Sequence, residues 1–458
     1  MIKKKRIYFI GIKGVGMTAL AQVFKAQGSY VSGSDIAEIF FTDEVLKKLR
    51  IPVYEGFSEK NLHKYPADMY IASSAYTTSN NPEVAYLSRM GTKIFSYAEA
   101  LGIAFNNHAR HGIIITGTHG KTTTTALVGT LLKTAKKDPT VVVGSRVRAW
   151  RTNAIVGRSK YWAIEGDEYQ DKLSYYNPYT VILTHLEYDH PDFFPDFATY
   201  KKTFKKFVAR IPRAGSLIAC GDHAAVRDVA RHTRARVIFY GFNKNNNVRV
   251  IPISQDTNTQ TFSLHVKNKK PVVLTTPLPG RHNLLNVAAA YILATQLRCS
   301  TPVIKKICAT FSGTSRRFEI IKSSDPIVID DYAHHPTEVR ATLEGARARF
   351  PDKKIIALFH PHTFSRTKAL MDDFATSFTN ADHTIVIEIY GSAREKKGGV
   401  SSRELVQKIN AHHSKSEYAR DLTDALKRTQ TLIAKNKKED LVILTIGAGD
   451  VWKIAKKL

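Results

Sequence analysis

The sequence predicts an α/β protein with three domains, of which the first and third are Rossmann-like and the central one has a mostly parallel sheet. Its 458 residues correspond to about three domains at roughly 150 residues each. Three times along the chain, a β-branched apolar run leads into a glycine-rich or polar turn, as in the strand-to-helix units of parallel sheets. We expect domains at residues 1–107, 108–312 and 313–458, without internal repeats.

The composition is that of a globular protein. Apolar residues make up 43% and charged residues 24% of the chain, which argues against disorder and fibrous repeats. The 68 Lys and Arg residues exceed the 40 Asp and Glu residues by 28 charges, and such a surface attracts polyanions. Because these residues are spread along the chain and form no long tract, we interpret the charge as a general lysine bias and expect no nucleic-acid partner.

Neither a membrane nor an oxidising compartment is indicated. The longest apolar runs are far shorter than the roughly 20 residues of a membrane helix. Residues 1–6 resemble the basic region of a signal peptide, but the apolar stretch at 8–12 is too short and Gly11 interrupts it. Three cysteines without CxxC spacing predict neither a disulfide framework nor a cysteine zinc site. A cytoplasmic protein is expected.

The first strand-to-helix unit lies at the start of the chain. Residues 6–10 predict a strand and 17–26 a helix, and the run at 68–72 is assigned to the same sheet. Between strand and helix stand three glycines, at positions 11, 14 and 16.

These glycines form a candidate diphosphate-binding turn. Gly11, Gly14 and Gly16 have the spacing GxxGxG, which differs from the dinucleotide pattern GxGxxG. Asp35 follows the next strand, close to where an acidic residue would meet a ribose. A turn without ligand is the alternative, but N–H groups at a strand end favour nucleotide or diphosphate binding.

The second unit begins after a polar stretch at 106–112, which is predicted to be a linker. Residues 113–115 predict a strand and 124–134 a helix. The segment between them reads Thr116-Gly-Thr-His-Gly-Lys-Thr-Thr123. It is a shorter variant of the pattern GxxxxGK[ST], since position 115 is Ile. Lys121 would neutralise phosphates and Thr122 would bind magnesium, so ATP or GTP is indicated.

Two further polar clusters follow predicted strands of the central domain. Glu165 ends the strand at 162–165, where a carboxylate often shares magnesium with a nucleotide. The strand at 181–184 leads into His185-Leu-Glu-Tyr-Asp-His190, whose histidines are either structural or ligands.

Two asparagines and two arginines near the end of the central domain are candidate ligand-binding residues. Asn283 and Asn286 precede a helix predicted at 287–296, where they either cap the helix or bind a ligand. Arg316 and Arg317 follow a loop at 311–315 and form either a solvated turn or a phosphate contact.

The third unit begins with a strand at 327–329 that ends in Asp330 and Asp331. Later strands are predicted at 354–359, 384–387 and 441–446, alternating with helices. Histidines cluster at 334–335 and 360–362, but their spacing is not HExxH and no cysteine assists, so zinc is not expected.

Taken in order, these motifs resemble those of the Mur ligase family, the ATP-dependent amide-forming enzymes of peptidoglycan precursor synthesis, over almost the whole chain. The matching motifs are Gly117-Thr-His-Gly-Lys-Thr-Thr123, Glu165-Gly-Asp-Glu168, Asp189-His190, Gly280-Arg-His-Asn-Leu-Leu-Asn286, Arg316-Arg-Phe318 and Asp330-Asp-Tyr-Ala-His-His-Pro-Thr-Glu338.

Within the family, most signals resemble the members that join L-alanine to UDP-N-acetylmuramate. They are Gly14-Val-Gly-Met17, Ser73-Ser-Ala75, Asn81-Pro-Glu83, His360-Pro-His-Thr-Phe-Ser-Arg-Thr367 and Gly447-Ala-Gly-Asp-Val-Trp452. The segments 167–169 and 189–196 look more like the recycling members, which join L-Ala-γ-D-Glu-meso-diaminopimelate to the same UDP-sugar. The carboxy-terminal segments are given more weight because that domain presents the amine in this family.

The resemblance implies a role for each domain: UDP-sugar binding for the first, ATP and Mg²⁺ binding for the second and amino-acid binding for the third. The implied UDP-sugar residues are Gly11, Gly14, Val15, Gly16, Asp35 and Ser74. The implied ATP residues are Gly117, Thr118, His119, Gly120, Lys121, Thr122, Thr123, Asn283, Asn286, Arg317 and Asp331. On the amino-acid side stand His334, His335, His360 and Arg366.

The implied reaction activates a carboxylate. The lactyl carboxylate takes the γ-phosphoryl group of ATP, and the amine then displaces phosphate from the acyl phosphate. Lys121, Glu165, His190 and Arg317 are the implied catalytic residues, and Thr122, Glu165 and His190 the implied metal ligands. Several family members use a carbamylated lysine, and the lysines at 201, 202, 205 and 206 leave that open here.

Two alternative functions, a nucleic-acid-stimulated ATPase and a dehydrogenase, explain less of the sequence. A nucleic-acid-stimulated P-loop ATPase accounts for the charge and Lys121, but it needs no second glycine turn and would need an aromatic single-strand channel. A nicotinamide dehydrogenase accounts for the first turn and leaves Lys121 without a role. A monomer or a homodimer is expected.

Overall fold

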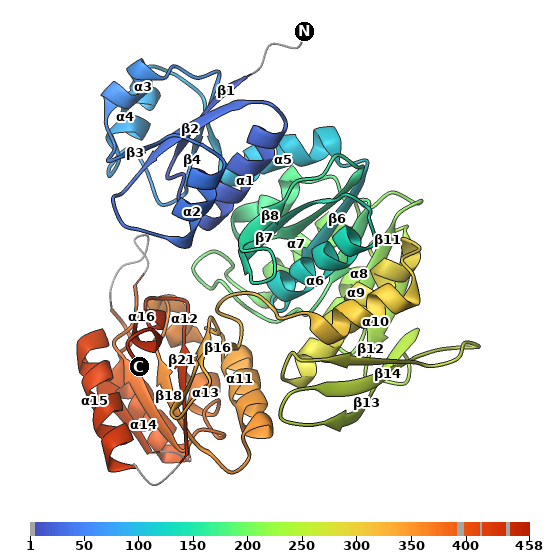
Figure 1. Ribbon diagram of the computed structural model, residues 1–458, viewed down its shortest axis with the longest axis vertical. Coiled ribbons are helices and arrows are strands. Elements are labelled where there is room, and N and C mark those ends of the chain that lie inside the picture. Colours follow the sequence, from blue (N-terminus) through green and yellow to red (C-terminus); the bar gives the residue numbers. More distant parts are fainter. Residues whose placement is uncertain (1–4, 392–397, 413–414, 437–439) are drawn as a thin grey trace.

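The computed structural model describes residues 5–391, 398–412, 415–436 and 440–458, so the basic start of the chain lies largely outside the described residues. It contains three sheets, each built from one continuous stretch of sequence. In Figure 1 the first sheet lies at the top in blue, the second at the right in teal to yellow, and the third at the lower left in orange and red. We call these parts the N-terminal, middle and C-terminal regions.

The N-terminal region has a five-stranded parallel sheet in the order β3-β2-β1-β4-β5, the order of a Rossmann-like half. Its strands are β1 (Arg6–Ile10), β2 (Tyr30–Asp35), β3 (Val53–Glu55), β4 (Met69–Ala72) and β5 (Ile94–Ser96). Its helices are α1 (Val15–Ala26), α2 (Phe41–Lys48), α3 (Glu59–Lys64), α4 (Pro82–Arg89) and α5 (Tyr97–His108). The predicted strands at 6–10 and 68–72 are confirmed as neighbours, because β1 pairs with β4.

The middle region has a ten-stranded sheet in the order β15-β14-β13-β12-β11-β10-β6-β9-β7-β8. Its strands are β6 (His111–Thr116), β7 (Thr140–Val147), β8 (Thr152–Ile155), β9 (Tyr161–Gly166), β10 (Thr180–Leu183), β11 (Ser216–Cys220), β12 (Arg236–Gly241), β13 (Val248–Gln255), β14 (Gln260–Val266) and β15 (Val272–Thr276). Its helices are α6 (Lys121–Thr134), the 3₁₀ helix η1 (Tyr169–Tyr175), α7 (Phe197–Val208), α8 (Ala224–Ala230), α9 (Arg281–Gln296) and α10 (Thr301–Thr310).

The predicted mostly parallel character of this middle sheet is confirmed. The strands from β13 through β12, β11, β10, β6 and β9 to β7 pair in parallel, and antiparallel pairs occur only at the two ends of the sheet. Strands β10 and β11 are buried along their whole length, as expected for parallel strands covered on both faces.

The C-terminal region has a six-stranded sheet in the order β16-β17-β21-β18-β19-β20, in which only the β16–β17 pair is antiparallel. Its strands are β16 (Glu319–Lys322), β17 (Ile327–Asp331), β18 (Lys354–Phe359), β19 (His383–Ile387), β20 (Lys415–Ala419) and β21 (Leu441–Ile446). Its helices are α11 (Pro336–Arg349), α12 (Phe364–Ala369), α13 (Met371–Ala375), α14 (Ser402–His412), α15 (Leu422–Lys435) and α16 (Trp452–Ala455).

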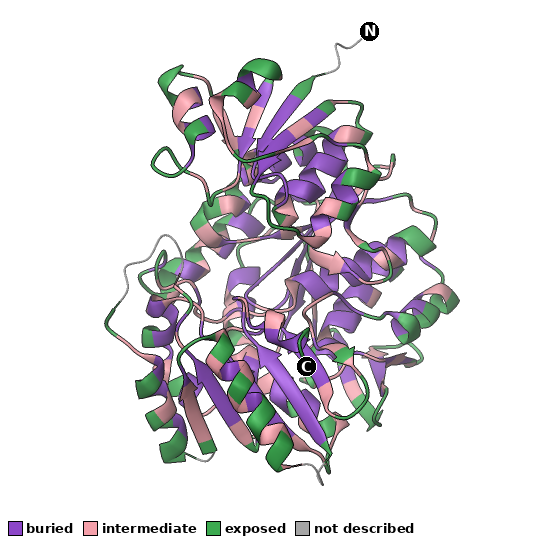
Figure 2. Cartoon of the chain, turned by 60° about the vertical axis from the view of Figure 1, so that its left-hand side comes forward, coloured by how far each residue is buried: buried purple, intermediate pink, exposed green. Residues whose placement is uncertain are grey.

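The sheets form the buried interior, and the outer helix faces carry the exposed residues (Figure 2). One apolar cluster runs from the first sheet into the middle region, where the ring of Phe105 meets Trp162 edge-on at 6.2 Å. Beside it, Gln22 of α1 donates to the Oδ1 atom of Asn153 and accepts from the hydroxyl of Thr152. These contacts join the N-terminal and middle regions.

Three expected boundaries are wrong. The stretch at 106–112 is not a polar linker, because α5 runs to His108 and β6 begins at His111; Asn106 bonds the loop at Tyr175 and Asn177. Helix α6 begins at Lys121, three residues early, and α9 at Arg281, six residues early. The residue before each helix is an N-cap glycine with positive φ, Gly120 or Gly280. A sequence pattern based on apolar residues does not show where such a helix begins.

None of the described helices is long and apolar enough to cross a membrane. All three cysteines, Cys220, Cys299 and Cys308, are free and buried, in line with the prediction of no disulfide framework.

Candidate active site

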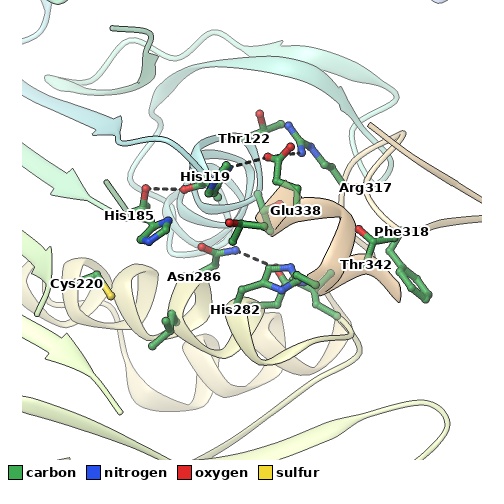
Figure 3. Close-up of a pocket in the computed structure, with 18 of the residues that line it drawn as sticks. His119, Thr122, His185, Cys220, His282, Asn286, Arg317, Phe318, Glu338 and Thr342 are labelled. Atoms are coloured by element: carbon green, nitrogen blue, oxygen red, sulfur yellow. Dashed lines mark hydrogen bonds and ion pairs between the residues drawn. The ribbon is translucent and has the colours of Figure 1, made fainter. Parts of the chain in front are cut away.

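A cavity of 410 Å³ lies between the middle and C-terminal regions (Figure 3). Its middle-region wall comes from the loop before α6, the ends of β10, β11 and β12, and the start of α9. Its C-terminal wall comes from the segment before β16, the end of β17 and helix α11. The carboxyl ends of parallel strands therefore supply much of its lining, as is usual for ligand sites in α/β sheets.

The loop before α6 has the geometry of a phosphate-binding loop. Gly120 has φ +80°, and a Cβ atom there would lie 2.4 Å from the Oδ1 atom of Asn286, so only glycine fits. The ammonium of Lys121 folds back and donates to the carbonyls of Gly117 and Thr118, at 2.5 and 3.1 Å, and reaches Glu168 at 3.3 Å. This arrangement holds the lysine charge at the N-terminus of a helix, a natural anion site.

Two sets of hard ligands stand next to this loop. The hydroxyl of Thr122 donates to the Oε2 atom of Glu165 at 3.1 Å, so a helix residue and a strand-end carboxylate meet as predicted. Among the described residues, Asp167, Glu168 and His190 form a second set, with ligand atoms all within 4.8 Å. Oxygen-rich sets of this kind fit Mg²⁺. The structure thus brings Thr122 to Glu165, and His190 to Asp167 and Glu168.

Burial changes the proton affinity of these carboxyl groups. It raises the pKa of Glu165, although Gly144 and Thr122 donate hydrogen bonds to the carboxylate. Burial would also raise the pKa of Asp167, but the charges of Lys172 and Lys121 overcome it and the pKa is lowered.

Part of the cavity lining is apolar, as in pockets that bind a nucleotide base. Its wall includes the side chains of Cys220, Tyr240, Phe242, Leu278 and Leu285. Burial raises the pKa of the Cys220 thiol to about 12, so the sulfur is a neutral wall atom. A phosphate loop and an apolar wall in one cavity fit a nucleoside triphosphate.

The two asparagines at the start of α9 line the cavity, and neither caps the helix. Gly280 is the N-cap of α9, so the capping alternative is wrong. The amide of Asn283 donates to the carbonyl of Pro279 at 2.7 Å, and Asn286 donates to Asn283 at 2.9 Å. Asn286 also accepts from Thr124 of α6, which ties α9 to the phosphate loop.

The adjacent arginines at 316 and 317 point in different directions. Arg317 lines the cavity and lies 3.6 Å from Glu338. Arg316 instead pairs with Asp330 at 3.0 Å and donates to the carbonyls of Gly447 and Gly449, so it is a structural residue of the C-terminal region. The expectation of a paired phosphate contact is therefore wrong for Arg316.

Asp331 lines the cavity beside Arg317. Its carboxylate accepts from the N–H groups of Phe318 and Ala333, at 2.7 and 2.8 Å, and so holds the segment that carries Arg317. Burial raises the pKa of Asp331 to about 6, although Arg317 and the two N–H groups oppose the rise.

Charged side chains join the two walls next to the phosphate loop. His119 contacts Glu187 of the middle region through its Nε2 atom and Glu338 of α11 through its Nδ1 atom, the latter at 3.0 Å. His335, predicted on the amino-acid side, lies 3.1 Å from Glu187, and Arg366 pairs with the buried Asp189 at 2.8 Å.

The other two residues predicted on the amino-acid side differ from each other. His334 lies at the same interface, 3.4 Å from Glu338, with its Nδ1 atom 3.0 Å from the carbonyl of Tyr332. His360 lies behind it, edge-on to Tyr390 and against Gly447 and Gly449, and it does not line the cavity.

The predicted sugar-nucleotide residues meet at the end of β1. Gly11 has φ +84°, and its N–H bonds the carbonyl of Ser34, while the first N–H groups of α1, at Val15 and Gly16, have no partner within the helix. Gly14 is the N-cap of α1, and Ser74 is exposed on the loop after β4.

Asp35 ends β2, as expected. Its carboxylate accepts from the N–H groups of Lys13 and Ile36 and is 4% exposed, so it fastens the glycine turn; its contact with a ribose stays a prediction.

The lysines considered for carbamylation lie on α7. Lys201 and Lys205 pair with Asp228 of α8, at 3.2 and 3.0 Å, and Lys202 and Lys206 are exposed.

Several residues at the site were not among those predicted from the sequence. Glu187 and Asp189 stand inside the predicted polar cluster 185–190, and Glu338 ends the motif that starts at Asp330, so the motifs contained the signal. Tyr240 and Phe242 carry no such signal, because an aromatic residue at a strand end is read as core.

Three family descriptions match successive parts of the chain: "Mur ligase family, catalytic domain" at residues 6–109, "Mur ligase middle domain" at 115–294 and "Mur ligase, glutamate ligase domain" at 316–449. The chain is 37% identical over 455 residues to the UDP-N-acetylmuramate–L-alanine ligase of Desulfitobacterium hafniense, covering 99% of both chains. It is 36% identical to the enzyme of that name from Clostridium acetobutylicum, covering 99% and 97%.

Solved structures are similar over the same length. The UDP-N-acetylmuramate-alanine ligase MurC of Thermotoga maritima superposes with a TM-score of 0.82 at 26% identity, covering 99% of this chain and 98% of that one. A murein peptide ligase of Psychrobacter arcticus superposes with a TM-score of 0.72 at 24% identity, covering 99% and 98%. With full-length relatives above one third identity and all three family descriptions matched in order, the chain belongs to the Mur ligase family.

Proposed function

We propose that this protein joins L-alanine to the lactyl carboxylate of UDP-N-acetylmuramate with hydrolysis of ATP, giving UDP-N-acetylmuramoyl-L-alanine, ADP and phosphate. The observation that carries this proposal is the full-length similarity, at 33–37% identity, to seven relatives that all bear the name of that activity. The geometry of the site supports it, because the cavity has a phosphate loop and an apolar wall, and Glu165 and Glu168 contact that loop from outside the cavity lining.

Each region has a proposed task. Residues 1–107 bind the UDP-sugar at the turn of Gly11 to Gly16, residues 108–312 bind ATP, and residues 313–458 bring in the amino acid. The break between α5 and β6, and the loop between α10 and β16, support these boundaries. A cytoplasmic location and a monomeric or dimeric state remain predictions from the sequence.

The first step of the reaction needs charge neutralisation. A carboxylate that approaches the γ-phosphate meets several negative oxygens. Arg317 lines the cavity, and Lys121 lies in the phosphate loop next to it, so these two cations would neutralise the oxygens. Thr122 with Glu165, and Asp167 and Glu168 with His190, are the residues that would hold Mg²⁺. When bound, Mg²⁺ neutralises phosphate oxygens and holds them in place.

The second step needs a neutral amine next to the acyl phosphate. The acyl group leaves its carboxylate oxygen on phosphate, and the amine nitrogen forms the new C–N bond and loses a proton. The walls contributed by α11 and the end of β17 keep water away from this intermediate, which would otherwise hydrolyse.

The recycling activity is a second candidate, since segments 167–169 and 189–196 resemble the members that use the tripeptide. In the structure these segments touch: the hydroxyl of Tyr169 donates to Asp192 at 2.7 Å, and its ring packs on His190 at 4.6 Å. The names of the seven relatives favour L-alanine.

Phosphate release by the purified protein with ATP, Mg²⁺ and UDP-N-acetylmuramate tests the proposal. L-alanine and the tripeptide L-Ala-γ-D-Glu-meso-diaminopimelate are compared, and the product is identified by mass. Release that depends on L-alanine is expected. Release driven only by the tripeptide would move the activity to recycling, and release stimulated only by polynucleotide would contradict both.

A further inference from the structure

Glu187 joins the phosphate loop to the C-terminal region through several contacts. Its backbone is bound to the loop, because its N–H donates to the hydroxyl of Thr118 and its carbonyl accepts from that hydroxyl, both at 3.0 Å. Its carboxylate contacts His119 of the loop, accepts from the hydroxyl of Thr337 on α11 at 2.9 Å and lies 3.1 Å from His335. One side chain therefore touches both walls of the cavity.

The ring of His119 is held from both sides by carboxylates. Glu187 of the middle region lies at its Nε2 atom, and Glu338 of α11 lies 3.0 Å from its Nδ1 atom. Two carboxylate oxygens at the two nitrogens require a proton on each nitrogen. Burial alone would lower the pKa of His119, but Glu338 and Glu187 raise it to about 9.

Among the described residues, six other titratable or charged groups face this cluster: His185, His223, His282, His334, His335 and Arg317. Burial lowers the pKa of His334 to about 3. Burial lowers the pKa of His185 and His282, to about 3 and about 4, so both are neutral near pH 7.

The contacts of Glu187 cross a cavity whose walls come from two regions. Movement of such walls during substrate entry and product release is common in enzymes. Separation removes Thr337, His335 and Glu338 from the cluster, while Glu187 and His119 stay together on the middle region.

We propose that Glu187 is a positioning residue for the ligation reaction, which sets the orientation of His119 in the phosphate loop when α11 is docked against the loop. This inference rests on the proposed function for its kinetic test. Through Glu187, docking of the C-terminal region would change the orientation of a phosphate-loop side chain. This effect is separate from any contact of that region with the amino acid.

The kinetic test is a double-mutant cycle with Glu187→Gln and Thr337→Val, two nearly isosteric changes on opposite walls. Glu187→Gln is expected to lower kcat about tenfold or more, with the KM for ATP changed less than about threefold, because misplaced groups cost mainly turnover. Thr337→Val should lower kcat on its own but have no further effect in the Glu187→Gln background, because both changes break one connection.

Glu344→Gln is the matched control, since Glu344 is exposed on α11 and the change alters the charge equally. It should leave kcat and KM unchanged. Additive effects of Glu187→Gln and Thr337→Val on kcat would overturn the proposal. So would a Glu187→Gln protein with normal turnover and a normal thermal midpoint.

A second measurement does not depend on the amine substrate. In ¹⁵N-histidine spectra of the full chain, the signal that disappears in His119→Asn should be that of a doubly protonated ring at pH 7 in the wild type. In Glu187→Gln the pKa of this ring should be lower, because only Glu338 then opposes the effect of burial. Stoichiometric zinc in the purified wild type, lost in Glu187→Gln, would overturn the proposal, because a metal ion would then join these side chains. Absence of L-alanine ligation in the wild type would refute the proposed function alone, since this readout remains.

Discussion

Arg366, on α12 of the C-terminal region, donates its Nε hydrogen to the Oδ1 atom of Asp189 in the middle region at 2.8 Å. The two side chains are 5% and 6% exposed, so this ion pair is buried between the regions. The residues are 177 positions apart in the sequence. Breaking a buried pair is costly because one charge is left without a partner.

Replacement of Arg366 by Gln is therefore expected to destabilise the docked C-terminal region by about 3 kcal/mol. Urea unfolding monitored by tryptophan fluorescence measures the change. Arg231→Gln, at an exposed position on the middle region, is the control and should change the stability by less than about 0.5 kcal/mol. Equal midpoints for the two variants would show that the pair contributes nothing to docking.

The stabilisation by this ion pair should disappear in acid. Burial would raise the pKa of Asp189, but Arg366 and neighbouring histidines hold it well below its usual range. A carboxyl with a lowered folded pKa stabilises the protein above its unfolded pKa of about 3.9, and that stability is lost as the pH falls through the folded pKa. The difference in urea midpoint between wild type and Arg366→Gln should be full at pH 7 and shrink below about pH 4. A constant difference down to pH 3 would contradict this assignment.

Replacement of Lys121 by Ala should abolish turnover and leave the fold intact. The ammonium is held at the phosphate loop by the carbonyls of Gly117 and Thr118, and Lys121 stands between Gly120 and Thr122, which both line the cavity. Loss of a preorganised cation at a phosphoryl group is expected to lower kcat by about a thousandfold or more. Phosphate release measures kcat, and far-ultraviolet circular dichroism checks the fold. Substantial residual ligation would argue against the phosphate loop.

Replacement of Gly120 by Ala should weaken nucleotide binding. The residue has φ +80°, and the added Cβ would lie 2.4 Å from the Oδ1 atom of Asn286, so the loop or the start of α9 must move. We expect ATP to bind about tenfold or more weakly, a loss that calorimetric titration can measure. Gly91→Ala serves as the comparison, because this glycine also has positive φ but no atom within 4 Å of the new Cβ. Unchanged ATP affinity in Gly120→Ala would mean that the loop relaxes without cost.

The sequence predicted those parts of the fold and site that depend on local pattern. Strand ends such as Glu165 and Asp331 were found because an apolar run stops at a carboxylate, and Lys121 because its loop has a fixed spacing. The sequence did not predict that two adjacent residues point to different places. Arg316, with φ +59°, turns into its own region while Arg317 turns to the cavity, and no sequence pattern encodes that difference.

Contacts between regions could not be predicted from one sequence. Glu187 and Thr337 are 150 positions apart, and their contact depends on how two sheets dock, which no local periodicity records. The same holds for the place of His360 behind the cavity, since its burial is decided by the turn at Gly447 and Gly449.

Each of the three sheets is built from one continuous stretch of sequence, and this affects the order in which the regions can fold during synthesis. Regions built from uninterrupted sequence fold one after another as the ribosome releases them. The phosphate loop is complete once β15 and α9 have emerged, well before Arg317 and α11 complete the opposite wall. The residues around the phosphate loop are therefore synthesised before the opposite wall of the cavity, and the enclosed cavity forms only after the last third of the polypeptide has emerged.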